Sequence, residues 1–443
     1  MTSIIITTII SLLLSTITFT DNTLLEESHY FKSAEEIIDS LSTNVQIKNA
    51  KYFKAGWAKT NITPSYKLPL GGYGARNGAY VSEVLDSVWA RGFVFDDGFN
   101  KYAIITLDAL IVPPAVTKKL QFLLPEIGYD LSKIYLSATH THCSMGGWAD
   151  SWLGYQFAGE FNQQIVDDLA NSIIVTIKNA EKELSNAKVG FGSYDAGQFV
   201  RNRLVGNQGT TDPWFRLIKI QKEDGSIGLI TSFAAHATVF SHRQMKYSRD
   251  YPGVLVDSLE HINKIEIAAF CAGAVGSHSP NVKGSDSYEK ISNLSSGLYS
   301  LARENIDSIQ MKTVNSMGSL LFDIPLREPH FRISQKLRIR PWLFNSLTEQ
   351  SKSYLSILKI GDIILTGTPC DFSGELINNI ETNANRLNHN IMVTSFNGGY
   401  IGYITNDKWY NIKGYETFTM NWFGPYNGSY FVYLINNLME ILI

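Results

Sequence analysis

The sequence contains very little cysteine. Only three of its 443 residues are Cys, namely Cys143, Cys271 and Cys370. Such an odd and sparse set is not a disulfide framework, and its spacing matches no zinc ribbon. At most one bridge could form. With 44% hydrophobic residues, the chain has the composition of a globular protein that buries a sizeable core.

An excess of positive charge is also absent. The 38 Lys and Arg residues are balanced by 41 Asp and Glu residues, which leaves a formal net charge of −3. This balance lacks the basic footprint of a nucleic-acid-binding protein, and we expect no nucleic-acid partner. Aromatic residues, by contrast, reach 12%, enough to pack the core and to line a cleft for an apolar ligand.

Long apolar runs are missing except at the N-terminus. Residues Ile4 to Leu14 form an uncharged, mostly apolar stretch with the length of a signal-peptide core, short for a membrane span. No Lys or Arg precedes it. We predict that residues 1–20 are a signal peptide cleaved near Thr20, with a signal anchor as the alternative. The protein is then secreted or extracytoplasmic, with possible association with a membrane.

The remaining chain is predicted to form one large domain. Residues 21–50 are polar and acid-rich, and we interpret them as a spacer outside the core, with a helix near Ala34 to Ser42. From residue 51 to 443, strands alternate with helices, but several strand pairs are hairpins, such as 89–95 with 101–108. This pattern predicts an α/β fold with mixed sheets and flanking helices, rather than a doubly wound parallel sheet.

Hydrophobic periodicity places the other main elements. Helices are predicted after Pro113-Pro114 and over residues 160–184, 250–261, 288–306 and 373–386, with a short apolar helix at the C-terminus. Strands are predicted over residues 134–136, 189–194, 215–221, 227–233, 265–271, 355–360, 363–366 and 391–395.

One stretch, residues 135–147, carries two histidines at the end of a predicted strand. His140 and His142 lie two residues apart and precede Gly146-Gly147. Side chains two apart on an extended chain point to the same face, and neutral imidazole is a preferred zinc ligand. Two histidines cannot close a zinc shell, so two polar residues at a solvated strand end are the alternative interpretation.

Three further polar residues follow apolar strands in the same way. They are His236, Ser279 and Asp371. Active sites of α/β folds collect at strand ends, and His140, His236 and Asp371 would together supply a His₂-carboxylate zinc set. The sequence alone leaves open whether these residues meet in space or lie in separate loops.

Eight short motifs extend this pattern. They are Gly56-Trp-Ala-Lys-Thr-Asn-Ile-Thr63, Gly72-Tyr73, Ala138-Thr-His-Thr-His142, Asn202-Arg203, Phe233-Ala-Ala-His-Ala-Thr238, Ser279-Pro-Asn281, Pro369-Cys-Asp-Phe-Ser373, and Gly402-Tyr-Ile-Thr405 with Tyr415-Glu416. In residue type and in order they resemble the motifs of the neutral/alkaline ceramidases, a family of zinc amidases that cleave the N-acyl bond of ceramide. The resemblance runs from Ala55 to about Pro425.

The resemblance implies a set of site residues and a reaction. It implies that Zn²⁺ is held by His140, His236, Asp371 and Tyr403, that His142 and Arg203 face the substrate amide, that Ser279 lies at the scissile carbonyl, and that Tyr415 is a second phenol near the bond. Zinc-activated water would hydrolyse the N-acyl amide of ceramide or a related lipid to a fatty acid and a sphingosine-like amine, with Ser279 binding rather than attacking. A lipid-binding homologue without turnover and a metal-dependent esterase or phosphoesterase are the alternatives.

The sequence also departs from the family pattern. Asp371 stands where the family has Glu, and Gly276-Ser-His278 replaces Gly-Asp-Val. We expect no C-terminal immunoglobulin-like domain after Pro425, and we expect peripheral contact with a membrane as a possible feature of substrate delivery. Asp108, at another strand end, is predicted to support a zinc ligand, and His261 and His278 are predicted to be non-catalytic.

Overall fold

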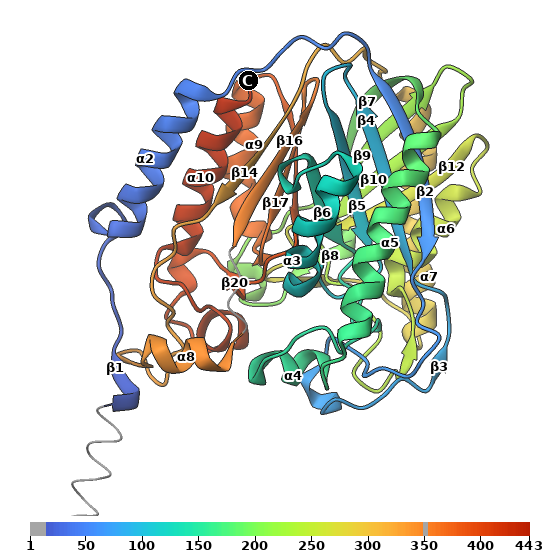
Figure 1. The fold of residues 1–443 in the computed structure, drawn as a ribbon. Helices are drawn as coiled ribbons and strands as arrows, with labels where there is room; N and C mark the ends of the chain where they lie inside the picture. The colour runs from blue at the N-terminus through green and yellow to red at the C-terminus, as the bar shows by residue number, and fades with distance from the viewer. Residues whose placement is uncertain (1–14, 349–352) are drawn as a thin grey trace, which may run out of the picture.

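The protein is built from two β-sheets that stack face to face between two layers of helices. A computed structural model describes residues 15–348 and 353–443 (Figure 1). Most of the predicted signal segment, residues 1–14, lies outside the described residues. The prediction of a mixed α/β fold with hairpins and flanking helices is confirmed.

The larger sheet has eight strands in the order β12-β10-β9-β7-β2-β4-β5-β6. Its strands are β2 (Lys54–Asn61), β4 (Trp89–Asp96), β5 (Lys101–Leu107), β6 (Ile134–Ala138), β7 (Ser185–Asp195), β9 (Trp214–Lys222), β10 (Ile227–Phe233) and β12 (Ile265–Ala272). β4 and β5, and likewise β9 and β10, are antiparallel, as the predicted hairpins require. β5 with β6 and β10 with β12 are parallel. β6 leads into His140 and β10 leads into His236, and the two imidazole rings meet with their centroids 4.7 Å apart.

The smaller sheet has four strands in the order β14-β16-β17-β19. They are β14 (Met317–Asp323), β16 (Tyr354–Ile360), β17 (Ile363–Thr368) and β19 (Asn390–Ser395). One buried cluster joins the facing sides of the two sheets, with Ile230 and Ile267 from the larger and Leu365 and Met392 from the smaller. This apolar layer fixes the two sheets against each other, because its burial is the main favourable term in such a sandwich.

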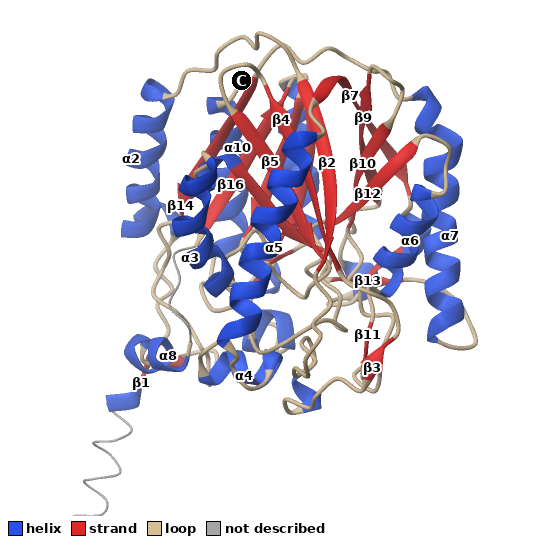
Figure 2. Ribbon diagram, turned by 45° about the vertical axis from the view of Figure 1, so that its right-hand side comes forward, coloured by secondary structure: helices blue, strands red, loops and turns tan. Residues whose placement is uncertain are grey.

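Amphipathic helices cover both outer faces (Figure 2). The larger sheet is covered by α3 (Pro114–Leu123), α5 (Gln163–Lys182), α6 (Asp250–Glu260) and α7 (Ser287–Asn305), and the smaller by α2 (His29–Asn44), α9 (Ile377–Arg386) and α10 (Asn427–Ile441). In α5 the buried residues Ile165, Leu169, Ile173 and Ile177 recur every four positions, which places them on one face.

The N-terminal helix corrects one prediction. α2 buries Phe31, Ala34 and Ile38, and the ring of Phe31 lies 4.8 Å from that of Tyr433 on α10. The interpretation of residues 21–50 as a spacer outside the core is therefore wrong for this helix. Phe31, Ala34 and Ile38 lie three and four positions apart, the spacing of one helical face, but the polar composition of residues 21–50 as a whole masked this pattern.

Short elements surround the ends of the strands that lead to the site. They are β1 (Ile17–Phe19), β3 (Glu83–Val84), α4 (Trp152–Ala158), β8 (Val200–Asn202), β11 (Lys246–Tyr247), β13 (His278–Pro280), β15 (Leu337–Ile339), α8 (Pro341–Leu347), β18 (Asp371–Phe372) and β20 (Tyr403–Ile404). Among the described residues, no helix combines the length and the hydropathy that crossing a membrane requires.

Asp108 offers a test of what stabilises the larger sheet. Its carboxylate accepts from Arg91 at 2.8 Å, and both side chains are 2% exposed. Removing one partner of a buried pair leaves the other charge uncompensated, so Asp108→Ala is expected to lower the free energy of unfolding by about 3–5 kcal/mol. Urea unfolding of wild type and variant measures this change in the free energy of unfolding. The exposed ion pair Arg386–Glu440 provides the control, because Arg386→Met should cost no more than about 1 kcal/mol.

Candidate metal centre

His140 is held rigidly at the end of β6. Its backbone takes the left-handed conformation, with φ of 60°, which is uncommon for a residue with a side chain. The ring Nδ1 lies 2.6 Å from the carbonyl oxygen of Leu110, and the ring of Phe396 stacks on it with centroids 4.0 Å apart. Because a carbonyl only accepts, Nδ1 carries the proton and the Nε2 lone pair is left free to bind a metal.

His236, directly after β10, is oriented in the same way. Its Nδ1 lies 2.8 Å from the carbonyl oxygen of Val275 and 3.1 Å from that of His278. Nδ1 is again the donor, so Nε2 again presents a lone pair. His278 thus takes part through its backbone, while its own Nδ1 lies against the Gly276 carbonyl.

Asp371 lies between the two imidazoles. It begins β18, which pairs in parallel with β20 so that Asp371 is opposite Tyr403. Oδ1 is 3.1 Å from Nε2 of His236 and 3.5 Å from Nε2 of His140, whereas Oδ2 accepts from the Tyr400 hydroxyl at 2.9 Å. Oδ1 is buried and has no hydrogen-bond donor of its own.

This arrangement suits a divalent cation. Two imidazole Nε2 atoms lie within 3.5 Å of one carboxylate oxygen, and buried charge requires a partner. Nitrogen and oxygen donors of this kind form the His₂-carboxylate set of catalytic zinc sites. The orphaned Oδ1 of Asp371 is therefore a feature that a bound metal ion would satisfy.

His142 completes a group of three histidines. Its Nε2 lies 3.2 Å from that of His140, and ligand nitrogens of His140, His142 and His236 all lie within 4.8 Å of one another. Gly72 permits this approach, because a Cβ there would fall 2.7 Å from the Cα of His142. His142 could thus be a ligand or a group facing the substrate.

Burial keeps these rings neutral. It lowers the pKa of His140 to about 3, with neighbouring His236 acting in the same direction. Burial also lowers the pKa of His142 and His236 well below the usual range, reinforced by His140 for the former and by Arg203 for the latter. For Asp371, burial raises the pKa, and His140 and Tyr400 oppose that rise. Neutral imidazole is the form that binds metal.

Arg203 brings a positive charge to the edge of the cluster. One of its terminal nitrogens donates to Nε2 of His236 at 3.2 Å and to the Tyr403 hydroxyl at 3.1 Å. Its Nε donates to Glu416 at 2.5 Å, and Glu416 also accepts from the backbone N–H of Ser277. The ring of Tyr415 lies 5.7 Å from that of Tyr403.

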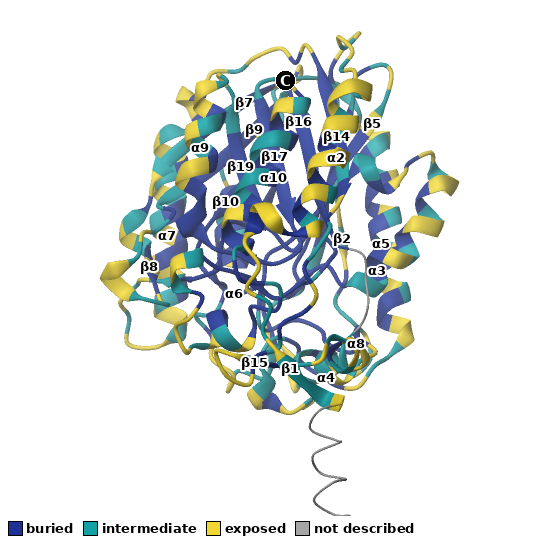
Figure 3. Ribbon diagram, turned by 90° about the vertical axis from the view of Figure 1, so that its left-hand side faces the viewer, coloured by how far each residue is buried: buried dark blue, intermediate teal, exposed yellow. Residues whose placement is uncertain are grey.

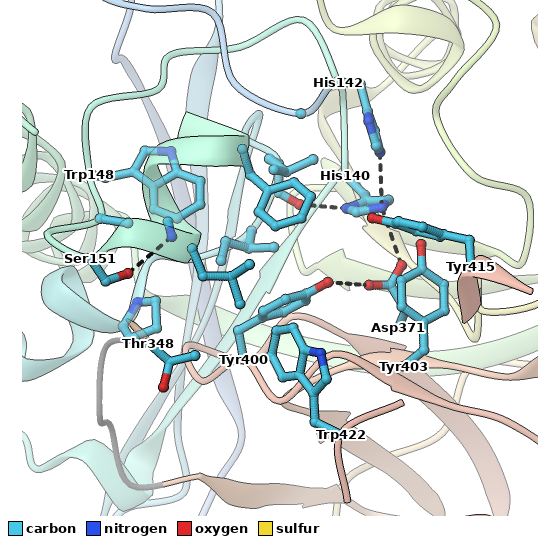
Figure 4. A pocket seen from close by; sticks show the side chains of 18 residues that line it. His140, His142, Trp148, Ser151, Thr348, Asp371, Tyr400, Tyr403, Tyr415 and Trp422 are labelled. Atoms are coloured by element: carbon cyan, nitrogen blue, oxygen red, sulfur yellow. Dashed lines mark hydrogen bonds and ion pairs between the residues drawn. The ribbon is translucent and has the colours of Figure 1, made fainter. Parts of the chain in front are cut away.

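The histidines form one wall of a pocket with an empty volume of about 780 Å³, partly open to solvent (Figure 4). Its polar side holds His140, His142, Asp371, Tyr400, Tyr403 and Tyr415. The opposite side is apolar and is formed by Trp148, Leu153, Phe157 and Trp422, two of them from α4. A reactive polar edge therefore faces a surface for an apolar ligand.

Two predicted residues lie elsewhere. The hydroxyl of Ser279, on β13, accepts from Nε of Arg201 at 3.2 Å, and Ser279 is not among the described residues that line the pocket. Asp108 binds Arg91 and the backbone N–H of Trp89, so the prediction that it supports a zinc ligand is wrong. The exposed Nδ1 of His261 contacts only its own helix.

Three contributing residues were not predicted. Tyr400 holds the carboxylate of Asp371, Phe396 covers the ring of His140, and Glu416 fixes Arg203. The first two belong to the loop 396–400, whose glycines were the only sequence signal for a close approach. In the sequence, the neighbouring Tyr415 drew attention to Glu416, but nothing indicated the ion pair between Glu416 and Arg203.

The fold and the cluster together define an α/β protein with a candidate metal centre at the ends of its strands. The family model "Neutral/alkaline non-lysosomal ceramidase, N-terminal" matches residues 53–301. The chain therefore belongs to the neutral/alkaline non-lysosomal ceramidase family.

Individual relatives support this assignment at low identity. The neutral ceramidase of Pseudomonas aeruginosa is 25% identical over 214 residues, which cover 44% of this chain and 32% of that protein. The neutral ceramidase of Drosophila melanogaster is 25% identical over 260 residues, covering 52% and 36%. The matched region thus spans about a third of the length of these curated relatives.

Solved structures share the fold. The crystal structure of neutral ceramidase from Pseudomonas aeruginosa aligns with a TM-score of 0.73 at 19% identity, covering 88% of this chain and 75% of that one. A structure described as ceramidase complexed with C2 aligns with a TM-score of 0.74 at 18% identity, with the same coverage.

The depressed pKa of His140 predicts how stability depends on pH. Between pH 6.5 and about 3, the unfolded chain binds a proton that the native ring does not, so stability must fall as the pH falls. In metal-free protein, His140 should contribute a slope of about 1.4 kcal/mol per pH unit below pH 6. Urea unfolding at pH 7, 6 and 5 should show a shallower slope for His140→Gln. The exposed-site control His261→Gln should keep the wild-type slope, and equal slopes in all three proteins would contradict the prediction.

Proposed function

We propose that this protein is a zinc-dependent hydrolase of the N-acyl amide bond of ceramide or a related lipid amide. The observation that carries the proposal is the convergence of two Nε2 lone pairs and the orphaned Oδ1 of Asp371 on the polar edge of an apolar-walled pocket. Membership of the ceramidase family supports the same reaction.

His140, His236 and Asp371 would hold the zinc ion. Tyr403 is the proposed fourth ligand, since its hydroxyl lies 3.4 Å from Nε2 of His236. His142, the third member of the histidine group, is the competing candidate for that position. When bound, zinc supplies a nucleophile at neutral pH, by lowering the pKa of water to about 7, and it polarises the carbonyl under attack.

The remaining polar residues would bind the amide and transfer protons. Arg203 is a fixed donor, because Glu416 holds its Nε while its terminal nitrogen points toward Tyr403. Arg203, His142 and Tyr415 would stabilise negative charge on the amide oxygen, and His142 or the Tyr415 hydroxyl would deliver a proton to the departing amine. We keep Ser279 as a proposed substrate-binding residue rather than a nucleophile, although its hydroxyl accepts from Arg201 outside the described pocket lining.

The apolar wall would receive a hydrocarbon chain. Trp148, Leu153, Phe157 and Trp422 line the same pocket as His140 and His142. Aliphatic chains gain about 0.8 kcal/mol for each methylene removed from water, so this wall favours a long-chain lipid amide over a small polar one.

A zinc and activity measurement on matched variants tests the proposal. His236→Ala removes one ligand, and it is expected to weaken zinc affinity by more than about a hundredfold and to abolish fatty-acid release from ceramide. His261→Ala, an exposed histidine outside the pocket, should change neither. Metal analysis and a panel of amide, ester and phosphate substrates provide the measurement.

The outcomes separate the alternatives. Zinc bound through His236 without hydrolysis of any substrate would indicate a lipid-binding homologue. Hydrolysis of esters or phosphates alone would indicate a different reaction on the same ligands. Full zinc content in His236→Ala would show that the ligand set is wrong.

Tyr400 is expected to act through Asp371. Tyr400→Phe removes a hydroxyl that donates to Oδ2, so the carboxylate loses part of its orientation, and zinc affinity should fall about 10- to 100-fold. Competition with a chelator measures the affinity. Tyr410→Phe, whose hydroxyl lies near His330 away from the pocket, is the control. Unchanged affinity in Tyr400→Phe would exclude this supporting role.

A further inference from the structure

Both exposed tryptophans of the described chain lie at one end of the molecule. Trp152 on α4 is 60% exposed and Trp342 on α8 is 56% exposed, whereas the other six of the eight Trp residues are not among the exposed large side chains. α4, α8 and β1 lie at the same end in three views related by rotation about one vertical axis (Figures 1, 2 and 3).

This end also carries the mouth of the pocket. Leu153 and Phe157 of α4 pack in one apolar cluster with Phe344 of α8 and Trp422, and α4 and Trp422 line the pocket. Tyr415 lines it too and is 51% exposed. We call the exposed side chains at this end, Phe19, Trp152, Tyr155, Trp342 and Tyr415, the aromatic surface.

The N-terminal segment is fastened to the same end. β1 pairs with β15, which places Ile17 opposite Ile339. The indole of Trp342 donates to the carbonyl of Ser15, and Nε of Arg338 donates to that of Phe19. Residues 15–23 thus form a strap that runs along β15 and reaches the start of α8.

Buried basic groups hold the strap at its other end. Arg327, 4% exposed, donates to the carbonyl oxygens of Asp21 and Thr23 and forms an ion pair with the Asp21 carboxylate at 2.7 Å. Nε2 of His330 accepts from the backbone N–H of Asp21. The strap satisfies buried donors of the domain, so losing it would leave them unpaired.

We propose that the aromatic surface is a docking site for a lipid bilayer in a chain that keeps its strap, which is the signal-anchor alternative to cleavage near Thr20. Trp and Tyr are the residues enriched at membrane–water interfaces. The sequence that precedes the strap, residues 4–14, is uncharged and mostly apolar. Docking would bring the pocket mouth to the lipid, whichever amide the pocket accepts.

The charge pattern selects the kind of bilayer. Exposed residues close in sequence to the aromatic surface carry both signs, with Lys336, Arg340 and Lys413 against Asp150 and Glu328. Apolar and interfacial contact requires no surplus of one sign, so we expect zwitterionic lipid to suffice. An acidic protein partner would instead need a basic patch.

Flotation of the purified full-length chain with phosphatidylcholine vesicles tests the proposal. The double variant Phe19→Ser, Trp152→Ser should lower the partition coefficient by about tenfold or more, because binding scales with the apolar area inserted. The control Phe99→Ser, Phe122→Ser removes two exposed rings from the far end of the molecule. Phe122 lies near the C-terminal end of α3, whereas Pro114, at the other end of that helix, lines the pocket. The control should float like the wild type.

Three results would overturn the proposal. They are a wild-type chain that stays unbound, equal loss in both double variants, and binding only to vesicles with anionic lipid. N-terminal sequencing of protein from expressing cells adds a further criterion, since a chain that begins after Thr20 would lack the strap.

A conservative variant guards against misfolding. Trp152→Phe keeps an aromatic ring, and it should reduce the quenching of tryptophan fluorescence by brominated phosphatidylcholine. Undiminished quenching would place Trp152 outside the bilayer and contradict the proposal. None of these readouts depends on amide hydrolysis, so a failed docking test and a failed activity test are distinguishable.

Discussion

The site depends on a carboxylate oxygen that lies against two imidazole lone pairs. Oδ1 of Asp371 lies within 3.5 Å of Nε2 on both His140 and His236, and each ring is prevented from turning by a carbonyl that accepts from Nδ1. In a buried site these three electron-rich atoms repel one another unless a cation binds between them. The surrounding structure must therefore hold three donors in place before any metal arrives, which requires rigid supports on every side.

Those supports come from both sheets. His140 and His236 follow strands of the larger sheet, whereas Asp371 follows β17 of the smaller one. The apolar layer between the sheets sets the distance between these strand ends. His140 and Phe396 both have left-handed backbone conformations. This local strain lets the packing point the ring of His140 toward the pocket and stack the ring of Phe396 on it.

The pocket joins this polar edge to an apolar wall and to an aromatic end of the molecule. The same cluster that packs Trp422 against α8 also receives α4, so the wall of the pocket and the exposed tryptophans rest on shared support. Recognition of a lipid amide and approach to a lipid surface would then be properties of one region. The strap of residues 15–23 ties the N-terminus to that region as well.

The sequence determined the mixed α/β class, the main hairpins and helices, and the residue types needed for a zinc site. Periods of two and near four residues are local properties, and histidines at strand ends can be read without knowing the fold. Only the tertiary structure decided that Asp371 meets His140 and His236, that Tyr400, Phe396 and Glu416 support them, and that Asp108 pairs with Arg91 instead. It also moved α2 into the core and Ser279 away from the pocket lining. The meeting of Asp371 with the two histidines depends on how two sheets stack across an apolar layer, and contacts between residues far apart in the sequence leave no periodic trace in the chain.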